Sequence, residues 1–330
     1  MSMTEFAASP PRALVQLARG MARRDDYTNF GFIAADWLTI VGIAALAHVG
    51  QNLALDALAV LVIGSRMRAL ANLMHEASHY KLFRSRSLNA VAGRVLCAWP
   101  IAESLGVYTR EHHLHHRTLW RSEADPDRRL YRLTDTETAS RPRMTFAHFA
   151  VHHVLLVLLL WYPGRRLLQD RRALVRGLAM GGGSIGLFVI SPTVGTVVIL
   201  NWALPWFTTY QVIGYWAELA EHGGLLERGW DWGSRNWSGH VLTRWLIGSH
   251  SADLYHLAHH WFPAVPHWRL AQLDRACRKL WPAYAGEIRC DGFFVARSEQ
   301  RTSVLRDIWS GGEPLTQVRP VALESTTILS

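Results

Sequence analysis

The stretch that decides the fold runs from Tyr255 to Leu270 and reads YHLAHHWFPAVPHWRL. His256, His259 and His260 stand at positions i, i+3 and i+4, which share one face of an α-helix because 3.6 residues make a turn. Three imidazoles that converge on one point can hold a transition metal. Two prolines, which interrupt helices, follow shortly after the last histidine, so we expect the helix to be short.

Working outward, similar histidine spacing recurs upstream. The segment EHHLHH, residues 111–116, repeats the i, i+3, i+4 pattern, and HEASH, residues 75–79, places histidines at i and i+4. A further histidine follows the last long apolar stretch. The candidate metal ligands are His75, His79, His112, His115, His116, His222, His256, His259 and His260. Because one zinc ion takes three or four protein ligands, nine imidazoles imply two metal ions, and imidazole suits iron, zinc and copper alike.

The composition indicates a membrane protein. Of 330 residues, 49% are hydrophobic, and the mean hydropathy of +0.03 averages very apolar runs with arginine-rich ones. The formal charge of +9 does not indicate a nucleic-acid partner, because the arginines cluster beside the apolar runs, as in positive-inside loops. The three cysteines, Cys97, Cys277 and Cys290, are far apart, which argues against a disulfide framework, a zinc ribbon or an iron–sulfur site. Residues 1–24 contain no apolar core of a cleavable signal peptide.

Four apolar stretches predict an all-α membrane protein with two transmembrane hairpins and a cytosolic helical cap that carries the dimetal site. The spans are residues 30–49, 53–75, 174–190 and 194–217, each near the length that crosses about 30 Å of hydrocarbon. Residues 1–29 are then a polar cytosolic segment, 30–310 the membrane domain and 311–330 a loose tail. With both termini and all nine histidines on the arginine-rich side, we expect a multi-pass protein of a bacterial inner membrane.

Some segments within this scheme are ambiguous. Residues 88–107 are apolar but interrupted by charges and a proline, which predicts an interfacial or re-entrant helix. Residues 146–162 have basic flanks on both sides, so an in-plane helix is favoured over a crossing. Arg66 and Arg68, near the inner end of the second span, are expected to snorkel to the membrane surface.

Spacing alone leaves a zinc hydrolase open. His75, Glu76 and His79 satisfy the His-Glu-x-x-His pattern of zinc proteases, in which the glutamate is the general base. The many further histidines downstream argue against that interpretation. A metal carrier is also disfavoured, because its ligands would be expected inside the spans.

Three segments together resemble a known family, the membrane-bound fatty acid desaturase superfamily of the acyl-lipid type. They read HEASHYKLFRSRSLNAVAGRVLCAWP, YTREHHLHHRTLWRSEADPD and YHLAHHWFPAVPHWRL, and they are similar to the family's three histidine boxes with their flanks. The resemblance covers about residues 30–280. It implies that the nine histidines hold two iron ions, and that O2 and two electrons are used to desaturate an acyl chain reached through a hydrophobic tunnel. A hydroxylase of the same family, acting on a lipid or another hydrophobic substrate, stays open.

Several residues are candidates for supporting roles. Glu218, where relatives often carry asparagine, and Glu221 are expected either to orient His222 or a metal-bound water, or to be solvated carboxylates at a helix end. His250 is a candidate second-layer residue, and Asp125 and Asp127 are expected to brace the second box. The remaining histidines are not expected to bind metal: His113 should face away, His148, His152 and His153 should pack at the interface, and His48, His240 and His267 carry no signal.

The chain contains no cytochrome b5 domain, flavin fingerprint or iron–sulfur motif, so the resemblance implies a separate electron donor. A ferredoxin, a rubredoxin or a cytochrome b5-type protein, each with its reductase, would serve. A set of arginines is expected to dock an acidic donor or to contact the anionic headgroups of membrane lipids. These are Arg84, Arg86, Arg128, Arg129, Arg165, Arg166, Arg171 and Arg172. The substrate carrier, whether lipid, acyl-carrier protein or CoA, is open, with a weak preference for a lipid-linked acyl group.

Overall fold

The computed structural model of the chain is built mainly of helices, as predicted, and describes residues 9–121, 123–133, 171–248, 250–287 and 289–310. Two short strands, β1 (Asn236–Trp237) and β2 (Arg289–Cys290), pair in parallel. The α-helices are α2 (Arg12–Met21), α3 (Thr28–Gly50), α4 (Leu53–Ser78), α5 (Arg86–Ala92), α6 (Leu105–Thr118), α7 (Arg128–Leu133), α10 (Arg171–Ile190), α11 (Pro192–Val198), α12 (Leu204–Phe207), α13 (Thr209–His222), α14 (Gly229–Trp232), α15 (Val241–Leu246), α16 (His250–Leu254), α17 (His256–Trp261), α18 (His267–Leu280), α19 (Pro282–Ala285) and α20 (Val304–Ser310).

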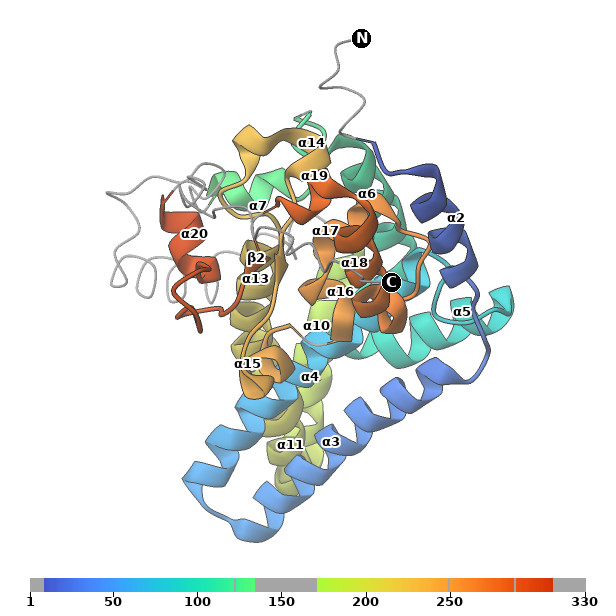
Figure 1. Cartoon of the computed structure of the whole chain (residues 1–330). Helices are drawn as coiled ribbons and strands as arrows, with labels where there is room; N and C mark the ends of the chain where they lie inside the picture. The colour runs from blue at the N-terminus through green and yellow to red at the C-terminus, as the bar shows by residue number, and fades with distance from the viewer. Residues whose placement is uncertain (1–8, 122, 134–170, 249, 288, 311–330) are drawn as a thin grey trace, which may run out of the picture.

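Helices α3 and α4 form an antiparallel hairpin that projects below the cap (Figure 1). They coincide with the first two predicted spans. Gln51 takes the left-handed conformation that ends α3, and the side chain of Asn52 accepts a hydrogen bond from the Leu55 N–H, which caps the start of α4. Because α4 continues to Ser78, it carries the first histidine box from the hairpin into the cap.

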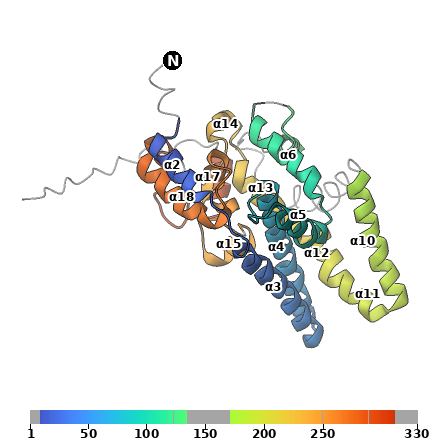
Figure 2. The same ribbon diagram turned by 90° about the vertical axis from the view of Figure 1, so that its right-hand side faces the viewer.

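A second hairpin, formed by α10 and α11, lies beside the first (Figure 2). The fourth predicted span, residues 194–217, is not one regular helix. It contains α11, a π-helical turn (Ile199–Ala203), α12 and the start of α13, with a break at Thr208. Pro205 has no N–H to offer the preceding turn, which is consistent with irregular hydrogen bonding here.

Helix α13 crosses α4 closely at Gly64. A Cβ atom at this position would lie 2.0 Å from the hydroxyl oxygen of Thr209 and 2.7 Å from the backbone nitrogen of Tyr210. The hydroxyl of Thr209 also donates to the Val60 carbonyl at 2.6 Å. This approach fixes the N-terminal end of α13, the helix that ends at His222, against the helix that carries the first box.

The segment between the first two boxes bends sharply. Helix α5, a π-helical turn (Gly93–Ala98) and a 3₁₀ turn (Trp99–Ile101) run together, and α6 then leaves at 93° to them. Ala102 takes a left-handed conformation at the bend, with φ of 59°. The prediction for residues 88–107 is an interfacial or re-entrant helix, and the structure shows the bend but not the place of the segment relative to a membrane. The bend lets α6 carry the second box back over the end of α4.

The cap is formed by α2, α6 and α14 to α19. The first of these helices was not predicted from the sequence. Residues 12–21 were interpreted as part of a polar lead-in. They form the amphipathic helix α2, whose Leu14, Ala18 and Met21 are buried in a cluster with Leu270 and Leu273 of α18. The arginines of this segment masked its apolar stripe at positions i, i+4 and i+7.

Among the described residues, α3 alone is long and apolar enough to cross a membrane as one straight helix, and the bent pair α5–α6 is a second candidate. The count of four spans therefore stays a prediction. Residues 146–162, His148, His152, His153 and the tail 311–330 lie outside the described part of the chain.

The expectation that Arg66 and Arg68 snorkel to the membrane surface is wrong. Both side chains are buried, because each has carboxylate partners inside the protein. Arg66 pairs with Asp36 of α3 at 3.0 Å, and Arg68 pairs with Asp253 of α16 at 3.1 Å. The first pair joins the two helices of the hairpin, and the second joins the hairpin to the cap.

Candidate metal centre

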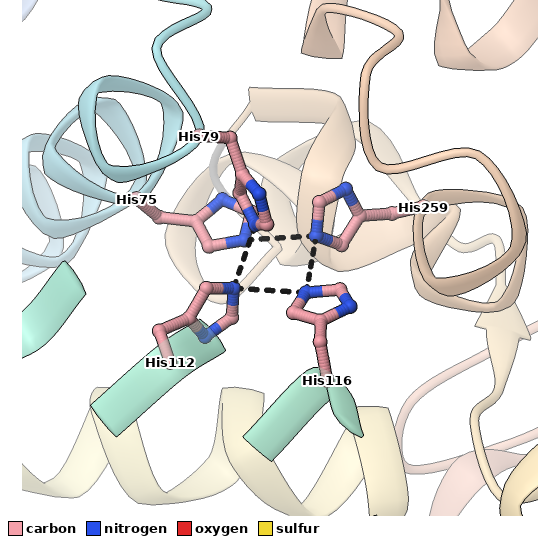
Figure 3. A group of neighbouring side chains, drawn as sticks. All are labelled: His75, His79, His112, His116 and His259. Atoms are coloured by element: carbon pink, nitrogen blue, oxygen red, sulfur yellow. Dashed lines mark hydrogen bonds between the residues drawn. The ribbon is translucent and has the colours of Figure 1, made fainter. Parts of the chain in front are cut away.

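Five histidines from three separate parts of the chain converge in what we call the five-histidine group. Its members are His75, His79, His112, His116 and His259, and their ligand atoms all lie within 4.8 Å of one another. Figure 3 shows their rings directed at a common centre. The Nε2 atoms of successive rings are 2.8–3.1 Å apart: His79 to His112, His112 to His116, His116 to His259, and His259 to His75.

The other four histidines form a second cluster, the four-histidine group. It consists of His115, His222, His256 and His260. The Nε2 atom of His222 lies 3.2 Å from that of His115 and 3.0 Å from that of His256, which in turn lies 3.0 Å from that of His260. The rings of His116 and His260 stack with centroids 4.2 Å apart, so the two groups are adjacent. His222, which no short repeat of histidines identifies, lies in the middle of its group.

The prediction that each i, i+3, i+4 triplet converges on one point is wrong. In both triplets the i and i+4 histidines enter one group and the i+3 histidine enters the other. A residue turns by 100° along an α-helix, so positions i+3 and i+4 lie on opposite sides of position i, about 100° apart. Each triplet therefore spans both groups, and one short helix supplies ligands to two centres.

The spacing of the nitrogens fits metal ligands. Metal–imidazole bonds are about 2.0–2.1 Å long, so two nitrogens at right angles around one ion would be about 3.0 Å apart, and two in a tetrahedron about 3.4 Å. The observed distances between Nε2 atoms, 2.8–3.2 Å, agree with ligands at right angles around a metal ion that takes five or six ligands. A hydrogen-bonded explanation is less satisfactory, because a neutral imidazole nitrogen either donates or accepts, whereas several of these atoms face two neighbours.

The protonation states also favour metal binding. Burial, reinforced by neighbouring positive groups, lowers the pKa of His79, His112, His116, His256, His259 and His260 well below the ordinary value. Burial likewise lowers the pKa of His222 to about 3. These rings are neutral at pH 7, and each offers a nitrogen lone pair without first losing a proton.

Two histidines of the four-histidine group are held by acceptors on their outer nitrogens. His115 Nδ1 lies 2.9 Å from Asp125 Oδ1 and 3.1 Å from Asp127 Oδ2, so these aspartates do brace the second box as expected. His222 Nδ1 lies 2.9 Å from the Gly233 carbonyl. Burial alone would lower the pKa of His115, but the two carboxylates outweigh it and raise the pKa to about 9. Such bonds leave Nε2 directed at the centre.

The surroundings of Glu76 argue against the zinc-hydrolase alternative. Its Oε1 lies 2.8 Å from the ammonium group of Lys81, and its Oε2 accepts a hydrogen bond from the His267 N–H at 3.0 Å. A general base must reach the reacting water, whereas this carboxylate is buried and already paired. In addition, five converging imidazoles exceed the three that a catalytic zinc ordinarily takes.

A polar cavity adjoins both groups. Its lining includes His75 and His112 from one group and His115 and His256 from the other. The remaining wall is formed by Arg68, Asn72, Tyr108, Asp127, Glu218, Glu221, Ala252 and Asp253, of which only the alanine is apolar. The sequence interpretation missed Arg68, Asn72 and Asp253. A signal was present for the first two, because they precede His75 by seven and three residues and so share its helix face.

The three candidate supporting residues lie at different distances from the histidines. Glu221 Oε1 lies 3.7 Å from His256 Nδ1 and 3.3 Å from Arg68. Glu218 lines the cavity, 3.9 Å from Arg68, and burial raises its pKa to about 7. His250 Nε2 instead pairs with Asp36 at 2.9 Å. His113 and His267 belong to neither histidine group.

A comparison with protein-family models decides the relationship that the histidine boxes suggested. The fatty acid desaturase family model matches residues 52–291, which include all nine clustered histidines. The chain belongs to the fatty acid desaturase family. This desaturase is therefore an oxidoreductase from a membrane-associated family, which confirms the resemblance drawn from the sequence.

Curated relatives of this desaturase cover most of its length. Dihydrorhizobitoxine desaturase of Bradyrhizobium elkanii is 28% identical over 303 residues, which are 87% of this chain and 85% of the relative. A chloroplastic omega-3 fatty acid desaturase of Glycine max is 23% identical over 320 residues, 85% of this chain and 68% of the relative. The temperature-sensitive chloroplastic sn-2 acyl-lipid omega-3 desaturase (ferredoxin) of Arabidopsis thaliana is 22% identical over 86% of this chain and 72% of its own.

Proposed function

We propose that the nine clustered histidines are the ligands of two iron ions, one in each group. The observation that carries this proposal is the division of the nine imidazoles into two adjacent groups with nitrogens at ligand spacing. Bound there, the two ions with O2 and two electrons would supply the oxidant that removes hydrogen from an unactivated C–H bond. The protein's own part is to hold nine imidazoles in place and to shield them from bulk water, six of them buried and three partly buried.

The proposed membrane arrangement has both hairpins crossing the bilayer, with the cap and both termini in the cytosol of a bacterium. Exposed apolar side chains along the hairpins support it. Leu38 of α3 is 72% exposed, and Leu53 and Ile190 at the far ends of the two hairpins are each 83% exposed. Apolar surface of this kind is stable in lipid rather than in water. Only 22% of the most apolar 18-residue segment of α3 is buried inside the protein, whereas the core helix of a soluble protein is mostly buried.

The substrate that the family relationship favours is an acyl chain, carried on a membrane lipid. The names of the plant relatives include omega-3 fatty acid and acyl-lipid substrates. An enzyme whose hairpins lie in the bilayer would receive such a chain directly from lipid. Hydroxylation stays as the alternative outcome, because the same oxidant acts on the same C–H bond and product choice depends on the placement of the substrate.

The lining of the cavity favours a second substrate class, a small polar molecule. Arg68, Asn72 and Asp253, which hydrogen-bond to one another, surround the space next to both histidine groups, so the walls of this space are polar rather than apolar. The relative from Bradyrhizobium elkanii is named for dihydrorhizobitoxine, not for a fatty acid. A substrate with hydrogen-bonding groups close to the reacting carbon would match the polar walls of this cavity.

A separate protein is proposed to deliver the electrons. The name of one Arabidopsis thaliana relative includes ferredoxin, and a rubredoxin or a cytochrome b5-type protein with its reductase would serve the same purpose. Arg84, Arg86 and Arg171 are exposed and are candidates to dock an acidic donor. Contact with anionic lipid headgroups is the competing use of the same charges.

One experiment tests both the metal and the reaction. Detergent-purified wild type and His259→Ala would be assayed for iron and zinc. The wild type would then be supplied with O2, ferredoxin and its reductase, and either an acyl lipid or small polar substrates. Two irons per chain that decrease in the variant, with a product lacking two hydrogens, support the proposal. A product that gains one oxygen identifies a hydroxylase. One zinc that His259→Ala leaves in place contradicts the proposal.

A further inference from the structure

The charged side chains behind the two histidine groups are distributed unequally. Behind the four-histidine group, the outer nitrogen of His115 contacts two carboxylates, Asp125 at 2.9 Å and Asp127 at 3.1 Å. A third carboxylate oxygen, from Glu221, lies 3.7 Å from the outer nitrogen of His256, but this carboxylate is itself paired with Arg68 at 3.3 Å. Negative charge therefore lies directly behind His115 in this group.

Behind the five-histidine group the nearest charges form a neutral pair. The ammonium group of Lys81 lies 3.5 Å from His259 Nδ1, and the same ammonium contacts Glu76 Oε1 at 2.8 Å. Glu76 Oε1 is in turn 3.8 Å from His75 Nδ1. Both members of the pair are buried, so water screens them little. Lys81, the positive member of the pair, therefore lies beside the outer nitrogen of His259, whereas the outer nitrogen of His115 in the four-histidine group faces carboxylates.

This asymmetry has a definite electronic consequence. A carboxylate that accepts the outer N–H of a histidine makes the imidazole a stronger donor to its metal, and negative charge nearby favours the higher oxidation state. An ammonium group beside the outer nitrogen acts in the opposite direction. We propose, resting on the two-iron function above, that the four-histidine group holds the iron that stays oxidised when the centre has accepted one electron.

The centre would accept its two electrons in two separate steps. With two ferric ions bound, one electron from the donor would convert the ion held by the five-histidine group to ferrous, and no bond would be made or broken. A second electron would do the same for the ion held by the four-histidine group. Lys81 and the Asp125–Asp127 pair are thus residues that set the order of reduction, acting through His259 and His115.

The test is a stepwise anaerobic reduction of the protein loaded with ⁵⁷Fe, using dithionite and followed by Mössbauer spectroscopy and by potentiometry. The wild type is expected to give two separate one-electron potentials and, at the one-electron point, equal amounts of localised ferric and ferrous iron. Asp125→Asn should raise the lower potential and reduce the gap. Lys81→Met, which leaves the carboxylate of Glu76 unbalanced, should lower the higher potential and also reduce the gap.

Matched variants separate charge from disruption. Lys279→Met, which replaces the only other lysine at an exposed position, should change neither potential. Asp127→Asn, at a less buried carboxylate, repeats the charge change if Asp125→Asn fails to hold iron. Equivalent irons in the wild type, or a shift of the higher potential in the aspartate variants, would overturn the inference alone. A protein that binds no iron would overturn the proposed function and this inference with it.

Discussion

The Nε2 atoms of His75 and His259 lie 3.0 Å apart although 184 positions separate the two residues in the chain. The first lies in the last turn of α4, which rises from the hairpin, and the second lies in α17 of the cap. This contact is where the proposed membrane part and the cap meet. The centre is thus assembled by the tertiary fold and not by any single motif.

The two groups should lose metal separately. His222→Ala removes one ligand of the four-histidine group and leaves the five-histidine group complete, so we expect iron to decrease to about half of the wild-type content. Measurement of iron and protein in the same purified sample checks this. The control is His113→Ala, at a histidine outside both groups, which should keep the wild-type content. Equal losses in both variants would contradict the assignment of ligands.

Much of this site could be predicted from the sequence because histidine spacing is a local property. All nine predicted ligands lie in the two groups. Their division between groups was not predicted, since it depends on how α6 and α17 are rotated against α4. The roles of Arg68 and Asp253 at the cavity were also missed, because the two residues meet across 185 positions and neither belongs to a motif. Arg68 was misinterpreted as a surface anchor, since sequence shows a charge near a membrane boundary but not its partner.

The fold was predictable where apolar length alone decides it. The positions of α3 and α4 follow from their apolar runs and from the turn between them. The path from Pro192 to His222 was not predictable in detail, because an apolar run shows the length of a span but not the π-helical turn and the break at Thr208 within it. Helix α2 was missed because its apolar stripe consists of only three buried residues within an arginine-rich segment.

The crossing of α4 and α13 at Gly64 should be sensitive to a single methyl group. In Gly64→Ala the new Cβ would clash with Thr209 and with backbone at Tyr210, so the helices must separate. Overpacking of this kind typically costs about 1–3 kcal/mol. We expect a lower thermal unfolding midpoint in detergent, together with reduced iron content, because α13 carries His222.

Gly42→Ala is the matched control for this substitution. Gly42 is also a mid-helix glycine, but a Cβ there meets no atom within 4 Å. The unfolding midpoint should therefore stay the same or rise slightly, since alanine is the better helix former by about 1 kcal/mol. Equal midpoints for the two variants would show that the helices do not approach as closely as described.

The buried guanidinium of Arg68 should be essential for stability. It lies 3.1 Å from Asp253 and 3.3 Å from Glu221, and it also bonds Asn72 at 2.7 Å. Arg68→Met would leave buried carboxylates without their cation, and breaking a buried pair in this way costs about 3–5 kcal/mol. Chemical unfolding should show the loss, whereas Arg84→Met at an exposed position should change stability by no more than about 0.5 kcal/mol. Similar losses in both would disprove the role of Arg68.

Metal loading should release a proton from His115. Its pKa of about 9 in the metal-free protein means that both ring nitrogens carry protons at pH 7, and Nε2 must lose its proton before it can bind. Affinity for metal at the four-histidine group should therefore rise with pH up to about 9. The neutral histidines with lowered pKa values, such as His256 and His260, release no proton at pH 7.

Calorimetric titration of the metal-free protein with zinc at pH 7, in buffers of different ionisation enthalpy, counts the protons released. The wild type should release about one proton from this source, because the pKa of His115 lies well above the working pH. In Asp125→Asn/Asp127→Asn the carboxylates that raise this pKa are removed, and burial then favours the neutral ring. The number of protons released should decrease towards zero in that variant. An unchanged count would show that the two aspartates do not hold the charge of His115.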